Sequence, residues 1–324
     1  MEKRKLGNSD LEITRIGFGA WALGGADWRF GWGPQDDQES IDAIHRAIDL
    51  GINWIDTAAA YGLGHSEQVI AKAIAGKRDK VIIATKCSLV WQEGDFDVRN
   101  CLKADSIRRE AEASLKRLNL DVIDLYQIHK PIPDEDVEEA WGAIAELIHE
   151  GKVRYGGVSN FNIEQIKRAQ AIHAVTSLQP PYSLIRRGVE DGLLEYCARN
   201  QIGVIVFSPM QAGILTEKFT LEWFAGLDEK DWRRRNKQFI EPNLSANLAL
   251  VEKLRPIAAR YGRPVSQLAI AWVLRRPEVT AAIVGSRRPS QIEETALAAT
   301  WELPGEAIAE IEGLLMEHNH ILGV

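Results

Sequence analysis

The feature that most constrains the fold is the regular alternation of short apolar runs with helix-like segments along nearly the whole chain. Strands that alternate with helices build parallel sheets, and eight such units within 324 residues fit a closed (β/α)8 barrel better than an open doubly wound sheet. We therefore predict an α/β fold, a single TIM barrel that spans residues 1–324. The eight predicted strands are 15–19, 53–56, 81–86, 123–129, 153–158, 176–179, 204–207 and 281–284.

Two additions to the regular barrel are expected. The polar turn 7–10 joins the short segments 4–6 and 11–14, which predicts an N-terminal β-hairpin. Residues 209–245, after the seventh strand, are too many for an ordinary connection and predict a lid or binding loop. Amphipathic helices are predicted over 37–50, 65–76 and 105–118, with a further one from about 134.

Composition narrows the class of function. A net charge of −7 with both signs interspersed argues against nucleic-acid or membrane binding. Three cysteines without metal-ligand spacing predict reduced thiols, no metal site and a cytoplasmic location. We expect no signal peptide and no transmembrane helix, because the N-terminus lacks an apolar stretch and no window holds 18 uninterrupted apolar residues. The oligomeric state is left open.

Ionisable side chains stand at the ends of three successive predicted strands. Asp56, Lys86 and His129 end the second, third and fourth strands, and Tyr61 lies shortly beyond Asp56. Each alone could be a turn residue, a surface lysine, a strand-end histidine or a packing tyrosine. Because the carboxyl ends of barrel strands converge on one rim, their joint placement predicts an acid–base cluster.

The chemistry of this cluster favours a tyrosine acid supported by a lysine. A free phenol has a pKa near ~10, which makes it a poor donor at neutral pH. A lysine ammonium at ~4 Å, with an effective dielectric constant of ~20, stabilises tyrosinate by about 4 kcal/mol, and burial opposes it. Asp56 would hold Lys86, and His129 would orient a carbonyl oxygen. A cluster that donates a proton to a forming alkoxide needs another source of hydride.

Two further segments bear on a nucleotide site. The glycine-rich stretch 17–25 lacks the G-x-G-x-x-G spacing, so we reject a Rossmann domain. The loop 285–294 after the eighth strand suits a phosphate better, because helix-start amides and two arginines attract anions. The basic run 233–235 is either a solvated loop or part of a lid that touches an anionic ligand.

Taken together, these motifs resemble those of the aldo-keto reductases, most of all a bacterial general-stress-protein branch and the related potassium-channel β-subunits. The ordered set extends over nearly the whole chain. The matching segments are Gly17-Phe18-Gly19-Ala20-Trp21, Ile55-Asp56-Thr57-Ala58-Ala59-Ala60-Tyr61-Gly62 with Ser66-Glu67, Ala84-Thr85-Lys86, Asp124-Leu125-Tyr126-Gln127-Ile128-His129 and Gly156-Gly157-Val158-Ser159-Asn160-Phe161.

The resemblance implies a catalytic tetrad of Asp56, Tyr61, Lys86 and His129 in which Tyr61 is the acid. It also implies that Ser159, Asn160 and Gln179 hold a nicotinamide amide and that Phe207, often tyrosine in the family, stacks on the ring. The remaining implied cofactor contacts are Gly19, Ala20, Trp21, Asp56, Ser208, Pro209, Met210, Gly213, Leu215, Lys218, Arg235, Gly285, Ser286, Arg287, Arg288, Gln291 and Glu294. Thr295 stands where many relatives have asparagine, which weakens an adenine contact.

We therefore predict an NADPH-dependent reductase that converts an aldehyde or ketone into an alcohol, or runs the reverse reaction. NADH is the less expected cofactor, because Arg287 and Arg288 suit a 2′-phosphate. The predicted substrate pocket comprises Trp21, Trp28, Tyr61, Trp91, His129 and Trp232, and the partner is a small carbonyl or alcohol. Two alternatives stay open, a slow cofactor-sensing regulatory subunit and a lyase that forms a Schiff base on Lys86.

Overall fold

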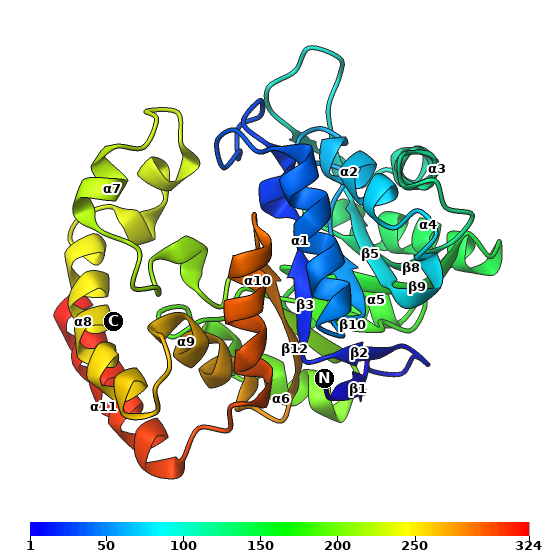
Figure 1. Cartoon of the computed structure of the whole chain (residues 1–324). Coiled ribbons are helices and arrows are strands. Elements are labelled where there is room, and N and C mark those ends of the chain that lie inside the picture. Colours follow the sequence, from blue (N-terminus) through cyan, green and yellow to red (C-terminus); the bar gives the residue numbers. More distant parts are fainter. Residues whose placement is uncertain (324) are drawn as a thin grey trace.

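The chain folds into a closed barrel of eight parallel strands, which confirms the predicted fold class. The computed structural model describes residues 1–323 (Figure 1). Neighbouring strands of the barrel follow one another in chain order, as repeated βα units require. The barrel strands are β3 (Ile16–Gly19), β4 (Trp54–Asp56), β5 (Ile82–Cys87), β8 (Ile123–Ile128), β9 (Val153–Ser159), β10 (Ser177–Gln179), β11 (Gly203–Val206) and β12 (Val279–Gly285).

Strand boundaries differ from the predicted ones by one or two residues, which matters at the rim. His129 and Phe207 lie one residue beyond β8 and β11 rather than inside them. Both still follow the strand direction, because the His129 amide donates to the Cys87 carbonyl at 3.1 Å and Phe207 forms a parallel bridge with Pro181. Their side chains therefore keep the positions that the strand pattern predicted.

The predicted N-terminal hairpin closes the end of the barrel at which the strands begin, opposite the rim where they end. Strands β1 (Lys3–Lys5) and β2 (Glu12–Thr14) pair antiparallel, and Leu6, Leu11 and Ile13 pack with inward-facing apolar residues of the barrel, Trp54 among them. The Trp54 indole donates to the Thr14 carbonyl at 3.0 Å. A side chain at Gly17 would collide with the Trp54 ring, so glycine is required there.

Helices surround the barrel and thicken it on one side. The longer ones are α1 (Asp37–Asp49), α2 (His65–Ala73), α3 (Ala104–Leu118), α4 (Val137–His149), α5 (Ile163–Gln170), α6 (Leu193–Arg199), α8 (Asn243–Arg260), α9 (Val265–Leu274), α10 (Pro289–Ala296) and α11 (Gly305–Leu322). Every residue of α9 is buried, because α9 contacts β12 on one side and α8 on the other, and α8 packs on α11 (Figure 1).

The segment between β11 and α8 lies at the end of the barrel opposite the hairpin. It contains α7 (Leu221–Ala225) and several single-turn helices, and Figure 1 shows it as the yellow-green lobe above α8. Rings of this segment meet rings of the loop between β3 and α1. In the chain as far as residue 323, no helix is long and apolar enough to span a membrane.

Candidate active site

The four ionisable residues predicted at the strand ends meet at one buried point. The Lys86 ammonium donates to Asp56 Oδ2 at 2.7 Å and to the Thr57 carbonyl at 2.8 Å. It also lies 3.4 Å from the Tyr61 hydroxyl, and the Tyr61 and His129 rings meet edge to face with centroids 5.9 Å apart. The side chain of Lys86 is fully buried. The structure thus brings the side chains of the predicted acid–base cluster together.

Two glutamines that face into the barrel hold Asp56 in place. Gln179 Nε2 donates to Asp56 Oδ1 at 2.8 Å and to the side-chain oxygen Oε1 of Gln127 at 3.3 Å. Gln127 Nε2 in turn donates to Asp56 Oδ1 at 3.4 Å. Sequence reasoning missed Gln127 as a site residue. The sequence did offer one indication. Gln127 is an amide side chain in the buried strand β8, two residues after the inward-facing Leu125, so it must also point into the barrel.

Burial dominates the proton affinities of the cluster. It raises the pKa of Tyr61 well above its ordinary value, and the negative charge of Asp56 adds to the rise. Burial lowers the pKa of Lys86 despite the opposing pull of Asp56. It also lowers the pKa of His129 well below its ordinary value, helped by the charges of Lys86 and Lys130. We expected burial only to reduce the effect of Lys86 on Tyr61, but burial is the largest cause of the shift and the pKa of Tyr61 is raised.

These protonation states suit the reduction of a carbonyl group. Tyr61 stays protonated at neutral pH, and a phenol is still a much stronger acid than the alcohol that a reduced carbonyl becomes. His129 stays neutral, so its imidazole carries one N–H that can donate to a carbonyl oxygen. The site therefore offers two neutral donors, Tyr61 and His129, at one buried rim.

The residues expected beside a nicotinamide ring line the next strand ends. Ser159 Oγ donates to the Gln179 carbonyl at 2.8 Å, and Asn160 Nδ2 donates to the His129 carbonyl at 3.0 Å. Asn160 and Ser208 both adopt left-handed backbone conformations, with φ of 62° and 56°. Such conformations cost energy outside glycine and concentrate at functional sites. Phe207 is partly exposed and so leaves part of its ring free for stacking.

The loop after Phe207 starts with buried and partly buried side chains. Pro209 and Leu215 are buried, whereas Met210 and Gly213 are partly exposed. Lys218 is exposed and pairs with Glu294 of α10 at 3.2 Å. This pair joins the loop to the helix that carries the predicted phosphate site. Gly19 and Gly285 end the adjacent strands β3 and β12 and pair in register, and Ala20 follows Gly19 directly.

The two arginines of the eighth loop are placed differently. The side chain of Arg287 is turned toward the loop between β3 and α1, where its Nε donates to Gln35 Oε1 at 2.6 Å. Arg288 is 62% exposed, and its nearest acidic partner, Glu39, lies 3.7 Å away. The helix start beside them is ordered by Gln291, which accepts from the Arg287 amide at 2.7 Å, while Ser286 Oγ donates to the Arg288 carbonyl at 3.3 Å.

A cluster of aromatic rings, which we call the aromatic cover, lies over Tyr61. Trp21 stacks between Tyr61 and Trp232, with centroid distances of 6.2 and 4.9 Å. Trp28 also meets the Tyr61 ring, at 6.1 Å. The rings of the cover are Trp21, Trp28, Phe30, Trp32 and Trp232. Sequence reasoning missed Phe30 and Trp32, because a loop has no periodicity that shows which of its rings face inward.

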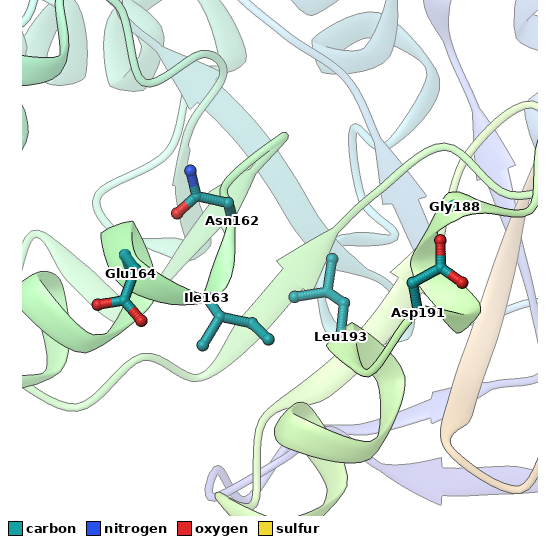
Figure 2. A pocket seen from close by; sticks show the side chains of 6 residues that line it. All are labelled: Asn162, Ile163, Glu164, Gly188, Asp191 and Leu193. Carbon is teal, nitrogen blue, oxygen red and sulfur yellow. The ribbon is translucent and has the colours of Figure 1, made fainter.

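Some predicted site residues are not brought to this cluster. The ring of Trp91 lies beside Arg117, whose guanidinium is 5.7 Å from its centroid, and not against the aromatic cover. Arg235 is exposed and donates within its own loop to the Lys230 carbonyl at 3.3 Å. A surface hollow of about 360 Å³ is lined by none of the tetrad residues. Its lining residues, shown in Figure 2, are Asn162, Ile163, Glu164, Gly188, Asp191 and Leu193.

Comparison with known proteins identifies the family. Residues 15–316 match the model of the aldo/keto reductase family. The aldo-keto reductase YhdN of Bacillus subtilis (strain 168) is 40% identical over 97% of this chain and 94% of its own length, and the NADH-specific methylglyoxal reductase of Escherichia coli (strain K12) is 34% identical over 92% and 93%. The glycerol dehydrogenase structure from Gluconobacter oxydans superimposes with a TM-score of 0.88 at 32% identity, covering 98% of this chain and 96% of that one. The chain belongs to the aldo/keto reductase family.

Proposed function

We propose that the protein is an NADPH-dependent carbonyl reductase in which Tyr61 is the general acid. The oxidoreductase class follows from the family, whereas the cofactor and the acid are our assignment. The observation that carries the assignment of the acid is the contact of the Tyr61 hydroxyl with Lys86 in a fully buried cluster. Tyr61 is the hydroxyl donor of that cluster, and the aromatic cover stands directly over it.

The residues at the rim fit a nicotinamide dinucleotide. A partly exposed flat ring at Phe207, amide and hydroxyl groups at Ser159 and Asn160, and an exposed arginine at a helix start are the groups that such a ligand requires. When bound, the cofactor supplies the hydride. The chain itself orients the carbonyl through His129 and Tyr61, excludes water with the aromatic cover and delivers the proton from the Tyr61 hydroxyl.

Lys86 acts on Tyr61 through charge and position rather than as a nucleophile. Its ammonium contacts Asp56, Thr57 and Tyr61, and its side chain has no exposed surface. A Schiff base would require the loss of the ion pair with Asp56 and would leave that carboxylate buried without its cation, which is costly. This geometry argues against the lyase alternative.

The preference for NADPH rests on Arg288. Its side chain is exposed and lies outside hydrogen-bonding distance of Glu39, so it is available to a 2′-phosphate. The methylglyoxal reductase relative is described as NADH-specific, which makes NADH the alternative cofactor to be tested here. NADPH and NADH differ only in this phosphate, so cofactor choice tests the eighth loop directly.

The test is a panel of small aldehydes, ketones and dicarbonyls, followed by loss of reduced-cofactor absorbance with NADPH and in parallel with NADH. We expect turnover of at least one carbonyl class, with a higher kcat/KM for NADPH, and loss of that turnover in Tyr61→Phe. Turnover that Tyr61→Phe retained would remove Tyr61 as the acid. Equal kcat/KM for both cofactors would remove the NADPH assignment, and tight NADPH binding without turnover would support the regulatory alternative.

A further inference from the structure

We propose that the two neighbouring arginines of the eighth loop have separate roles. Arg288 binds the 2′-phosphate of the cofactor, whereas Arg287 is a positioning residue that fixes the aromatic cover above Tyr61. The inference rests on the proposed function, because it divides the cofactor and substrate sides of the same site. It also departs from the sequence-based expectation, which gave both arginines to the phosphate.

The guanidinium of Arg287 is committed to one loop. It donates to Gln35 Oε1 at 2.6 Å, to the Trp32 carbonyl at 3.3 Å and to the Pro34 carbonyl. Gln35 returns a hydrogen bond from its Nε2 to the Arg287 carbonyl at 3.0 Å. A phosphate that recruited this guanidinium would have to break these bonds and leave carbonyl groups of the loop without a donor.

Arg288 has no comparable commitment. Its side chain is 62% exposed, and its distance of 3.7 Å from Glu39 is that of a loose ion pair. The next residue, Pro289, is the first residue of α10, so an anion beside Arg288 would also face the amide groups at that helix start. Arg288 could therefore bind an anion at the loss of one loose ion pair, whereas Arg287 would lose its hydrogen bonds to the loop.

The loop that Arg287 holds carries a central ring of the aromatic cover. Trp32 meets Trp21 edge to face at 5.3 Å and Trp232 at 5.5 Å. The guanidinium of Arg233 lies 4.7 Å above the centroid of the Trp32 ring. Trp21 in turn stacks on Tyr61. A continuous set of contacts thus runs from Arg287 through Trp32 and Trp21 to the proposed acid.

The backbone around Trp32 depends on few other bonds. The Trp32 amide donates to the Gly25 carbonyl at 3.2 Å, while the carbonyls of Trp32 and Pro34 accept from Arg287. Loss of the guanidinium therefore loosens the loop between β3 and α1 rather than the barrel. Because this loop covers the substrate side of the site, Arg287 should affect carbonyl binding more than phosphate binding.

Binding of nucleotide fragments separates the two roles without any turnover. Calorimetric titration of 2′,5′-ADP and of 5′-AMP would compare two ligands that differ only in the 2′-phosphate. We expect Arg288→Ala to weaken 2′,5′-ADP at least about ten-fold, as the loss of a charge-assisted bond implies, and to leave 5′-AMP nearly unchanged. Arg287→Ala should change the affinity of both ligands by the same factor. A loss in Arg287→Ala that is specific to 2′,5′-ADP would overturn the division of roles.

The positioning role has its own readout in the loop. Hydrogen–deuterium exchange of peptides from residues 25–36 should speed up in Arg287→Ala and in Gln35→Ala. The double variant should exchange more slowly than the sum of the two single effects predicts, because both changes remove the Arg287–Gln35 bond. Arg287→Lys, which keeps a cationic donor, should recover part of the protection. Unchanged exchange in Arg287→Ala, or fully additive effects in the double variant, would contradict a positioning role.

Kinetics complete the test in an enzyme that turns over. Arg287→Ala should raise the carbonyl KM about ten-fold and change kcat far less, because the tetrad keeps its geometry. A drop in kcat at constant KM would contradict the proposal. The control is Arg263→Ala, which removes an arginine that also donates to a glutamine, Gln267, but that lies over Trp301 and away from the aromatic cover. If no carbonyl is reduced, the proposed function fails, but the exchange and fragment-binding experiments still test the separate roles of the two arginines.

Discussion

The tetrad and the aromatic cover lie against each other but are held by different forces. Lys86, Asp56 and the two glutamines are joined by hydrogen bonds between strands of a closed barrel. The cover is built from rings on two loops that meet face to face and edge to face, with a single direct side-chain hydrogen bond from Trp21 to the Phe30 carbonyl within one of them. The comparison indicates that the chemistry is preorganised by the barrel, whereas access depends on loops that can move.

The ion pair beside Trp232 supports this distinction. The side chains of Asp231 and Arg233 are buried and bonded to each other, but the two residues are only two positions apart in the same loop. Their pairing shapes a turn and does not fasten that turn to the barrel. The turn meets the loop between β3 and α1 through ring contacts, such as Trp232 with Trp21 and Arg233 over Trp32. Such contacts are weaker and less directional than the tetrad bonds.

The largest expected effect is on the tetrad. Tyr61→Phe removes the proposed proton donor but keeps the ring that Trp21, Trp28 and His129 contact. Because general acid catalysis contributes about 10²–10⁴-fold, kcat should fall at least into that range. Reduced-cofactor affinity, measured by fluorescence titration, should change by less than about 1 kcal/mol. A matching loss of cofactor affinity would show that the cover and the tetrad are not separable.

A second effect concerns how the free energy of unfolding depends on pH, through a largely buried carboxyl group beside the barrel. Glu110 of α3 accepts from the Ser88 amide, just beyond Lys86, at 2.8 Å, and burial raises its pKa from 4.5 to about 7. Because this carboxyl group binds its proton more tightly in the folded than in the unfolded chain, the folded state loses stability as pH rises from about 4.5 to about 7. Glu110→Gln should therefore raise the free energy of unfolding by about 1–3 kcal/mol at pH 8 and leave it unchanged near pH 4.

Urea denaturation at the two pH values would measure this difference. The control is Glu112→Gln, two residues further along α3, which removes an exposed carboxylate that pairs with Lys152. Its effect should be small and should not grow with pH. A stabilisation by Glu110→Gln of equal size at both pH values would contradict a raised pKa.

A third effect should separate the cover from the tetrad. Trp232→Ala removes the ring that stacks on Trp21, so tryptic cleavage within 209–245 should speed up and the carbonyl KM should rise about ten-fold with little change in kcat. Trp223→Ala is the control, because Trp223 lies in the same loop and packs on Arg233 but is 44% exposed and is not part of the aromatic cover. Saturating NADPH should slow cleavage in the unaltered chain. Cleavage at the same rate with and without cofactor would count against a loop that closes over it.

The smallest effect should come from the exposed pair at the edge of the loop. Lys218→Ala removes a salt bridge to Glu294 in which Lys218 is 75% exposed, and such pairs contribute about 0–1 kcal/mol. The melting temperature should stay the same, and cofactor affinity should fall by a few-fold at most, with the difference vanishing in high salt. A large and salt-independent loss would mean that the loop is fastened more firmly than its ring contacts indicate.

The barrel and its tetrad could be predicted because both follow from local periodicity. Apolar runs that end in Asp56 and Lys86 identify parallel strands, and parallel strands in a barrel share one rim. The role of Gln127 could not be read so easily, since an amide in a strand becomes meaningful only when Gln179 and Asp56 are seen beside it. The extra helical layer formed by α8 and α11 also came only from the structure.

What the sequence by itself determined is the order of the strands, the residues at their ends and hence the identity of the four groups that could do acid–base chemistry. Only the tertiary structure decided the proton affinities and the partners of the loops. Burial raises the pKa of Tyr61 where the nearby lysine alone suggested a lowering. Arg287 turns away from its neighbour Arg288 to hold residues about 250 positions earlier in the chain. Periodicity carries information along one element, whereas desolvation and long-range pairing depend on which elements the fold brings together.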